Sequence, residues 1–135
     1  MKISNNFDLT EFVKSATADK LGIDNTPDEQ AKENIVRLVV NVLQPLRNAY
    51  GNPITINSGY RCPELNKAVG GSNTSSHMKG EAADITAGSP EKNKTLFNLV
   101  KKMNLSFDQM IDEKNFSWVH ISYRENNNRN QILHL

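Results

Sequence analysis

The chain has 135 residues and a mass of 15.2 kDa, which is enough for one domain with a single buried core. Its 16 basic and 15 acidic side chains give a net charge of +1, so composition offers no reason to expect a nucleic-acid partner. No segment approaches the roughly 20 apolar residues that a membrane-spanning helix needs. We therefore expect one domain over residues 1–135, a monomer, with a polar C-terminal tail at 124–135.

The ends of the chain and its cysteine content bear on the compartment. The first residues lack the apolar region of a secretory signal, which predicts a protein that is cytoplasmic as synthesised. Cys62 is the single cysteine, so an internal disulfide is excluded. Because Cys62 precedes Pro63 at an expected helix start, we interpret it as a small, mostly apolar side chain. A thiolate metal ligand, or a nucleophile paired with His77, is the alternative.

Two helix-start signals lie in the N-terminal third. Asp8 and the glutamate three residues later have the pattern of a capping box, which predicts a helix through about Lys20. Thr26, followed by a proline and two acids, predicts a longer helix over 27–49 with the threonine as its cap. Pro45 lies inside this helix, so we expect its last turn to kink or tighten. The buried stripe of the helix follows helical spacing and comprises Ile35, Leu38, Val39, Val42 and Leu46.

The remainder of the chain alternates strands and helices. Residues 54–56 alternate as a strand does, and 63–69 predict a short helix that ends at a glycine pair. A third helix is expected over 90–103, with its lysines on the solvent side. The runs 107–111 and 118–123 predict a hairpin. The fold class is therefore α+β, a small antiparallel sheet with helices packed on it.

The last strand-like run separates its side chains onto two faces. Alternation places one set on the apolar side, namely Val119, Ile121 and Tyr123. The opposite face carries Trp118, His120 and Ser122. His120 is therefore expected to point away from the core, where a cleft can form.

Three residues form a candidate metal site. His77 and Asp84 are seven residues apart, and Gly80 between them permits a tight turn before a strand. With His120 they offer two imidazole nitrogens and one carboxylate oxygen, a ligand set that leaves a fourth zinc position for water. The helical zinc-protease motif, with two histidines four residues apart, does not occur, so the ligands must come from loops and strands. The polar loop 72–76 is expected to border the cleft.

Three separated motifs occur in a fixed order along the chain. They are Ser58-Gly59-Tyr60-Arg61, Ser76-His77-Met78-Lys79-Gly80-Glu81-Ala82-Ala83-Asp84 and Trp118-Val119-His120. Together they resemble the zinc D-alanyl-D-alanine carboxypeptidase family, which includes phage and bacterial peptidases that cut peptidoglycan stem peptides. The resemblance extends from Phe7 to Tyr123 in the compact form of the family. It implies the hedgehog/D,D-peptidase fold and a Zn²⁺ cofactor on the three candidate ligands.

The resemblance also assigns substrate-binding residues. Arg61 stands at a strand end, where an arginine can polarise the scissile carbonyl or hold a substrate carboxylate. Residue type alone favours a surface salt bridge for Arg61, whereas the similar position in the family favours contact with substrate. Ser76 and Trp118 are predicted to contact substrate as well. The alternative for Trp118 is a partly buried ring that covers the metal site.

A peptidase also needs a group that takes a proton from the attacking water and returns one to the leaving amine. Glu113 and Asp112 end the first hairpin strand, and alternation allows only one of them to face the cleft. The resemblance favours Glu113 as the catalytic base, with Asp112 in reserve. Glu81 and His134 are expected to be exposed to solvent.

The function predicted from the sequence is zinc-dependent hydrolysis of a peptide bond in peptidoglycan, by a D,D-carboxypeptidase or an endolysin-like endopeptidase. Release by a phage lysis system would bring such a cytoplasmic product to the cell wall. One alternative is a non-catalytic, zinc-bearing wall-binding module of a phage or prophage particle. Another is a cysteine hydrolase that uses Cys62.

Overall fold

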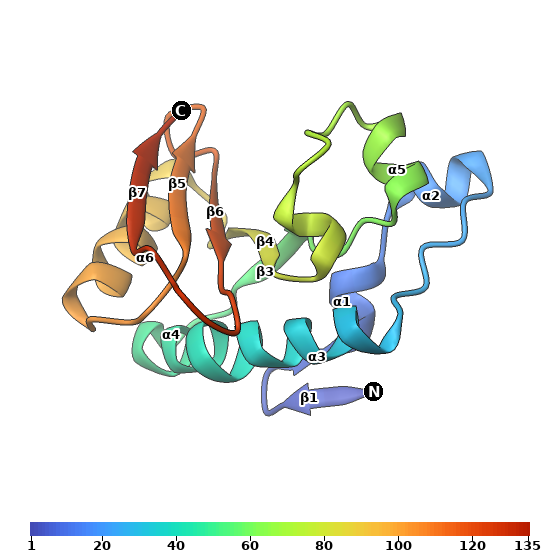
Figure 1. Cartoon of the computed structure of the whole chain (residues 1–135). Coiled ribbons are helices and arrows are strands. Elements are labelled where there is room, and N and C mark those ends of the chain that lie inside the picture. Colours follow the sequence, from blue (N-terminus) through green and yellow to red (C-terminus); the bar gives the residue numbers. More distant parts are fainter.

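The computed structural model describes every residue from Met1 to Leu135 and shows a five-stranded sheet with helices against it (Figure 1). A two-stranded hairpin at the N-terminus lies apart from this sheet. The expected α+β class is confirmed. The elements are β1 (Lys2–Ser4), β2 (Phe7–Asp8), α1 (Leu9–Val13), α2 (Ala16–Leu21), α3 (Glu29–Leu38), η1 (Val39–Leu43), α4 (Gln44–Tyr50), β3 (Thr55–Ser58), α5 (Pro63–Ala68), η2 (Ser76–Lys79), β4 (Ala82–Thr86), α6 (Pro90–Lys102), β5 (Gln109–Glu113), β6 (Trp118–Ser122) and β7 (Gln131–His134).

The strands of the main sheet lie in the order β3-β4-β6-β5-β7. The first four are antiparallel neighbours, as predicted, whereas β7 runs parallel to β5. The sequence did not predict β7, because a four-residue strand in a polar tail has little periodicity. Its position is set by Asp108, whose carboxylate accepts two hydrogen bonds from the Arg129 guanidinium, at 2.9 and 2.8 Å. The expected purely antiparallel sheet is therefore wrong at this edge.

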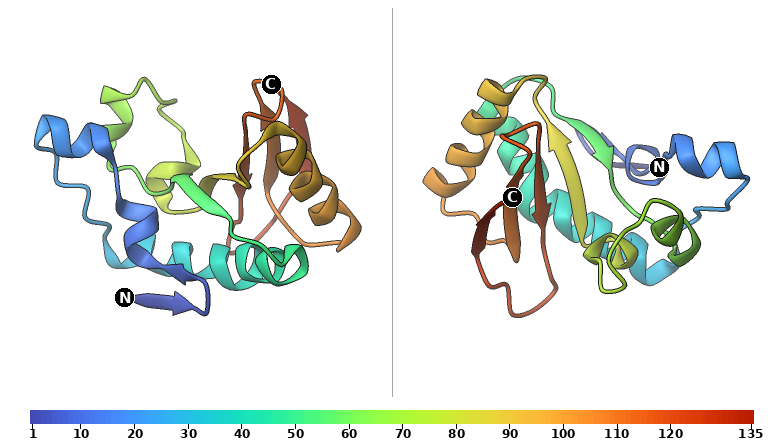
Figure 2. Two further views of the ribbon diagram at one scale, coloured as in Figure 1. Left: turned by 180° about the vertical axis from the view of Figure 1, so that it is seen from behind. Right: turned by 90° about the horizontal axis from the view of Figure 1, so that it is seen from above.

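Strand alternation gives the sheet one apolar face and one polar face. Helix α6 and the continuous helix formed by α3, η1 and α4 pack on the apolar face. Figure 2 shows α6 beside the strands, with α3 and α4 crossing near one end. The side chains that this face buries are Ala83, Ile85, Met110, Val119 and Ile121. The helical side of the same core supplies Leu38, Val42, Leu46, Leu96, Phe97 and Val100. The opposite face is left for polar residues.

The N-terminal helix is shorter than expected. Asp8 does form a capping box with Glu11. The Asp8 N–H donates to the Glu11 carboxylate, and the Asp8 carboxylate accepts from backbone N–H groups of the first helical turn. The helix stops at Val13, however, and Ser15 caps a second helix, α2. The predicted continuous helix through Lys20 is therefore two short ones. A competing N-cap inside the run explains the break, because a serine side chain satisfies the free N–H of a new first turn.

The long helix begins two residues later than predicted and contains an irregular turn. Asp28, not Thr26, caps it, through a 2.8 Å hydrogen bond from the Ala31 N–H to the aspartate. Residues Val39–Leu43 form a π turn in which the Gln44 N–H reaches the Val39 carbonyl. The helix is therefore wider just before Pro45, whereas the sequence predicted a kink or a tighter last turn. Proline has no N–H to donate, and the π turn rearranges the backbone hydrogen bonds at this point.

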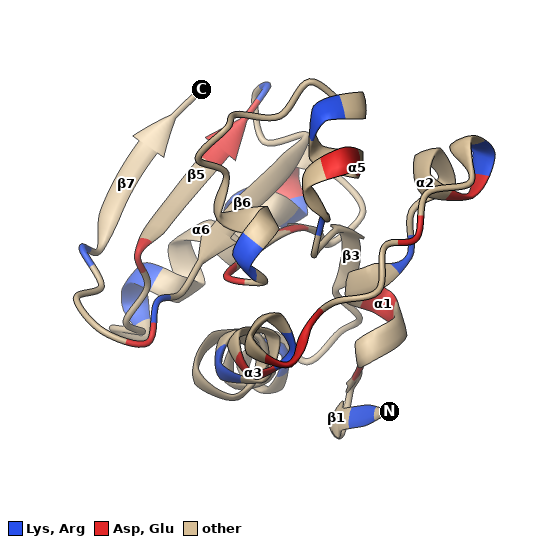
Figure 3. Ribbon diagram, turned by 45° about the vertical axis from the view of Figure 1, so that its right-hand side comes forward, with Lys and Arg blue, Asp and Glu red and all other residues tan.

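The third long helix, α6, follows the prediction closely. Ser89 caps it through a hydrogen bond from Lys92 N–H, and Pro90 opens its first turn. Its lysines are exposed, while Leu96, Phe97 and Val100 are buried. Basic and acidic segments are interspersed along the ribbon (Figure 3). None of the helices has the length and hydropathy that crossing a lipid bilayer requires.

Candidate active site

Asp84 and His120 meet because two neighbouring strands hold them in register. Asp84 is in β4, and its Cα partner in β6 is His120. Both side chains lie on the polar face of the sheet, as alternation predicted for His120. The Asp84 Oδ1 and His120 Nδ1 atoms are 3.0 Å apart.

His77 reaches the same point from a loop. It lies in η2, a single 3₁₀ turn that Ser75 caps by accepting a hydrogen bond from the His77 N–H. Gly80 ends this turn at φ +74°, and a Cβ there would lie 2.4 Å from the Ala31 carbonyl oxygen. Only glycine fits both the left-handed backbone and this close approach. The turn predicted between His77 and Asp84 is therefore confirmed.

A backbone carbonyl fixes which nitrogen of His77 faces the cluster. The Nδ1 atom donates to the Gly59 carbonyl oxygen over 2.7 Å, so Nε2 is the atom directed at Asp84, 3.4 Å from Oδ1. Metal-binding histidines are commonly oriented in this way by a second partner. His77 is 3% exposed, which leaves its ring almost no freedom to turn elsewhere.

The three side chains can hold a metal ion together. One ligand atom from each of His77, Asp84 and His120 lies within 4.8 Å of the other two, and the imidazole rings meet edge to face at 5.1 Å. Burial by itself would raise the pKa of Asp84, but hydrogen bonds from His120 and His77 hold that pKa well below its usual value. An ionised carboxylate with two imidazoles is a donor set that fits Zn²⁺.

The ligands form part of the lining of a pocket of about 460 Å³ on the polar face of the sheet. Four other residues singled out in the sequence line it too: Arg61, Ser76, Glu113 and Trp118. The loop 72–76 borders it, as expected, with Ser72, Thr74, Ser75 and Ser76. The structure therefore brings together the metal-binding group, an acid, an arginine and an aromatic side chain from distant parts of the chain.

Glu113 faces the pocket and Asp112 does not. Glu113 is the Cα partner of Trp118, whose indole Nε1 donates to Glu113 Oε2 over 3.1 Å. Asp112 points to the other side of β5, where it contacts His134 of β7. Figure 3 shows this end of β5 in red, because the two acids are adjacent in sequence. The geometry therefore leaves Glu113 as the acid that is available in the pocket.

Of the two residues expected to be exposed to solvent, His134 is exposed and Glu81 is not. The His134 side chain is 69% exposed, as expected, although its ring also contacts Asp112. Glu81 is half-buried, not exposed, and burial raises the pKa of its carboxyl. Glu81 does not line the pocket, because it precedes β4 on the side nearer Arg37 and Arg124.

Arg61 is a half-buried cation without an acidic partner. No carboxylate lies within ion-pair distance of its guanidinium, whose Nη2 donates to Ser75 Oγ over 3.3 Å. Its Nε is fully buried and has no hydrogen-bond partner. Burial lowers the pKa of Arg61, while Asp84 and Glu113 act in the opposite direction. A guanidinium with unused donors in this pocket is suited to an anionic group or a carbonyl oxygen.

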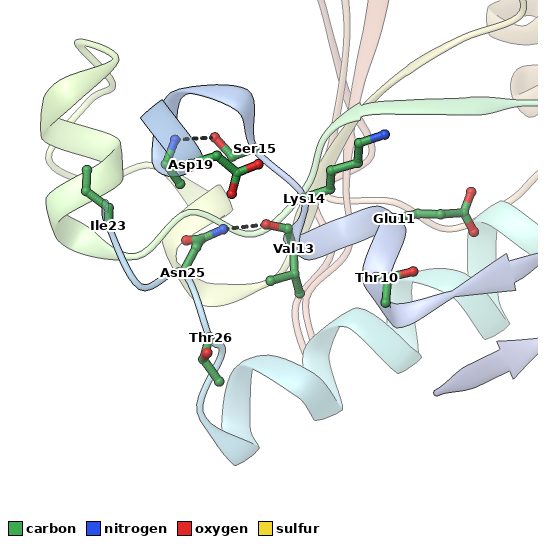
Figure 4. Close-up of a pocket in the computed structure, with 10 residues that line it drawn as sticks. Thr10, Glu11, Val13, Lys14, Ser15, Asp19, Ile23, Asn25 and Thr26 are labelled. Atoms are coloured by element: carbon green, nitrogen blue, oxygen red, sulfur yellow. Dashed lines mark hydrogen bonds between the residues drawn. The ribbon is translucent and has the colours of Figure 1, made fainter. Parts of the chain in front are cut away.

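Asn25 holds the backbone on both sides of Arg61, a role that was not predicted from the sequence. Its Nδ2 donates to the carbonyls of Tyr60 and Val13, at 3.0 and 2.9 Å, and its Oδ1 accepts from the Cys62 N–H at 2.7 Å. Figure 4 shows Asn25 pointing at Val13, beside a hollow between α1, α2 and Thr26. An asparagine in a polar link gives no sequence signal of such a role.

Cys62 takes a structural position. Its Sγ accepts a hydrogen bond from the Leu65 N–H at the start of α5, where the residue serves as N-cap. It is absent from the metal-binding group and from the pocket lining. Neither the thiolate-ligand nor the nucleophile interpretation is therefore supported by its placement.

Comparison with known proteins gives two findings. A family model described as Peptidase M15 matches residues 5–122. A zinc D-Ala-D-Ala carboxypeptidase of Streptomyces albus G is 52% identical over 48 residues, which are 35% of this chain and 19% of that protein. The match therefore covers about a fifth of that relative's length. Together with the His77, Asp84 and His120 group, these findings agree with the expected zinc cofactor.

Proposed function

This chain belongs to the peptidase M15 family, and we propose that it hydrolyses a peptide bond in peptidoglycan stem peptides with the help of zinc. One observation carries the proposal: the three ligands lie in the same pocket as Glu113 and the unpaired Arg61. The relative's name states a zinc-dependent carboxypeptidase that acts on D-Ala-D-Ala, which supports the substrate class. A metal-binding group without an acid and a cation beside it would support metal storage equally well.

His77 Nε2, Asp84 and His120 Nδ1 would hold the zinc, because these are the atoms directed at one another. When bound, zinc supplies a Lewis acid that polarises a carbonyl and lowers the pKa of a water ligand to about 7. The Gly59 carbonyl keeps His77 in the tautomer that leaves Nε2 free for this role. These three side chains bind and orient; none of them needs to transfer a proton.

Glu113 is the proton carrier in this proposal. Its Oε2 is held by the Trp118 indole, so Oε1 is free to accept a proton from the attacking water. As the water oxygen bonds to the carbonyl carbon, the proton passes to Glu113. When the C–N bond breaks, Glu113 returns that proton to the leaving amine, and the carboxylate is regenerated. Trp118 thereby orients the base and covers one side of the pocket.

Arg61 would stabilise negative charge during the reaction. The guanidinium donates to Ser75 with one nitrogen and has further donors without partners. These can bind the oxygen of the attacked carbonyl as it becomes an oxyanion, or a substrate carboxylate next to it. The low local polarity that lowers the pKa of Arg61 also strengthens these contacts. Ser76, at the rim of the pocket, would contact the peptide backbone.

The finer identity follows from the same resemblance. We propose the compact hedgehog/D,D-peptidase fold, with activity as a D,D-carboxypeptidase or an endopeptidase and an endolysin-like role in which a phage lysis system brings the enzyme to the wall. The mixed sheet with its ligands on the polar face is compatible with this fold. Digestion of purified muropeptides, followed by mass spectrometry of the products, identifies the bond and separates end-trimming from cross-link cleavage.

The decisive variant is Glu113→Gln. We expect it to retain zinc, since Glu113 is not one of the three clustered ligands, and to lose about 10²- to 10⁴-fold in kcat because the proton carrier is gone. Glu64→Gln, an exposed glutamate of α5, is the matched control and should hydrolyse at the wild-type rate. Wild-type turnover by the Glu113→Gln protein contradicts the assignment. A wild-type protein that binds zinc and wall fragments without cutting them indicates the wall-binding alternative.

A further inference from the structure

A second hollow adjoins the active-site pocket on the far side of Arg61. It has a volume of about 450 Å³ and lies between residues 14–17, which form the link after α1 and the start of α2, and strand β3 with the turn that follows. Arg61 and Val69 line both hollows, so the two adjoin at these residues. We call this hollow the Lys14 groove.

The charges of the Lys14 groove have one sign. Lys14 and Arg61 are its two charged residues, no acidic side chain lines it, and neither cation has an ion-pair partner. Figure 4 shows Lys14 directed away from Asn25 and Thr26. The remaining lining mixes hydroxyl, amide and apolar groups: Ser15, Ala16, Thr17, Ile56, Asn57, Ser58, Tyr60 and Leu65. Such a surface favours a peptide that carries a carboxylate.

The strand beside the groove is an edge strand. β3 pairs with β4 alone, so the opposite edge of Thr55–Ser58 has no strand partner, although α1 packs near it. An extended peptide can bind such an edge through its own backbone and place alternate side chains into a neighbouring hollow. The strand ends at Ser58, whose partner across the paired edge is Asp84, so the metal-binding group lies one strand away from the free edge.

Arg61 joins the groove to the reaction centre. Its buried Nε has no hydrogen-bond partner, although buried donors are almost always paired. Asn25 fixes the backbone on both sides of it, so the Arg61 side chain starts from a fixed position. A ligand oxygen between the two hollows would supply the missing acceptor.

We propose that the Lys14 groove is a second subsite, which binds an extended, carboxylate-bearing flank of the peptide substrate along β3. The identification of this peptide as a substrate rests on the proposed function, whereas the preference for an anionic peptide rests on the groove alone. Lys14 is a specificity-determining residue in this view. It binds the flank and takes no part in bond cleavage.

Binding to the zinc-loaded Glu113→Gln protein tests the proposal without turnover. The probes are two stem-type peptides, extended on either side of the scissile bond, each made once with glutamate and once with glutamine in the extension. We expect the glutamate form to bind more tightly, and Lys14→Gln to reduce that preference by about two- to five-fold, since the lysine is exposed. Lys14→Glu should reverse the preference in favour of the glutamine form.

The matched control is Lys20→Gln, an exposed lysine of α2 that lies outside the groove and has no ion pair. It should leave the preference unchanged. Equal affinity for glutamate and glutamine peptides, or an equal loss in the Lys20 variant, overturns the proposal. Hydrolysis of an unextended peptide by the wild-type protein is measured separately, as the test of the proposed function. If that hydrolysis fails while the Lys14-dependent preference persists, the proposed function is wrong and the subsite remains.

Discussion

The residues of the active site are held in two different ways. Asp84 and His120 are fixed by strand pairing, because β4 and β6 place them directly opposite one another. His77 and Arg61 come from loops, where hydrogen bonds from His77 to Gly59, from Arg61 to Ser75 and between Asn25 and the backbone beside Arg61 take the place of strand pairing. Strand register alone therefore specifies half of the site, whereas the other half depends on particular side-chain contacts. Substitutions in the two halves should therefore fail differently.

The largest effect is expected in the strand-held half. His120→Ala removes a ligand without disturbing the apolar face of β6, so we expect zinc binding and hydrolysis both to be lost while the fold persists. Zinc content by mass spectrometry, circular dichroism and muropeptide turnover measure the three properties. A His120→Ala protein that keeps stoichiometric zinc and full activity would show that the ligand set is misassigned.

In the loop-held half, we expect a substitution to disturb the position of Arg61 before it weakens zinc binding. Asn25→Ala leaves the Tyr60 carbonyl and the Cys62 N–H without their partner, at a cost of about 1–3 kcal/mol in the free energy of unfolding. Because Arg61 then moves more freely, kcat should fall while zinc affinity stays near the wild-type value. Asn52→Ala, at an exposed position, is the control and should change neither. A zinc affinity that falls in parallel with kcat would argue against a role specific to Arg61.

Far from both halves, the edge strand β7 offers a pH-dependent test. The hydrogen bonds from Arg129 hold the pKa of Asp108 below its ordinary value, against the effect of burial. The pair therefore stabilises the fold above the unfolded pKa of about 3.9 and loses that contribution as pH falls through the lower folded value. Asp108→Asn should cost about 1–2 kcal/mol at neutral pH, discounted because Arg129 is half exposed.

Denaturant titration at a series of pH values measures this effect. The stability gap between the wild type and Asp108→Asn should be widest at neutral pH and should narrow below about pH 4. Hydrolysis should be unaffected at neutral pH, because Asp108 is outside the pocket. A gap that is constant with pH would show that the carboxylate charge is not what the strand depends on.

The smallest effect is expected on the solvent side of α6. Lys94→Gln alters an exposed side chain without an ion pair, so the free energy of unfolding should change by less than about 0.5 kcal/mol. Activity should also be unchanged. A measurable loss of activity in this variant would mean that the lysines of α6 meet the substrate or a partner, contrary to the interpretation of that face.

The same division explains which parts of the site the sequence could predict. Alternation in 118–123 and the glycine turn after His77 are local signals, and they placed His120 and the turn correctly. The choice between Asp112 and Glu113 needed the register of β5 against β6. Asn25 and Gly59 act through contacts between distant segments, which no local pattern records.

The fold shows a similar limit. Long amphipathic segments such as α6 were predicted almost to the residue, because caps and periodicity agree there. The break at Lys14 and the strand β7 were missed, since both depend on competition between weak signals. An extra N-cap at Ser15 decided the first, and the ion pair of Asp108 with Arg129 decided the second.

The wide turn at Val39–Leu43 sets a constraint on chain length. It takes up one more residue than a regular helical turn, and each residue of an α-helix accounts for about 100° of rotation. Deleting one residue there would restore a regular helical turn and leave the following segment facing the same way, whereas deleting a residue from the regular part of α3 would rotate that segment by about 100° and carry Leu46 out of the core. Homologues that lack this extra residue can therefore keep the same side of α4 packed inward on a regular helix.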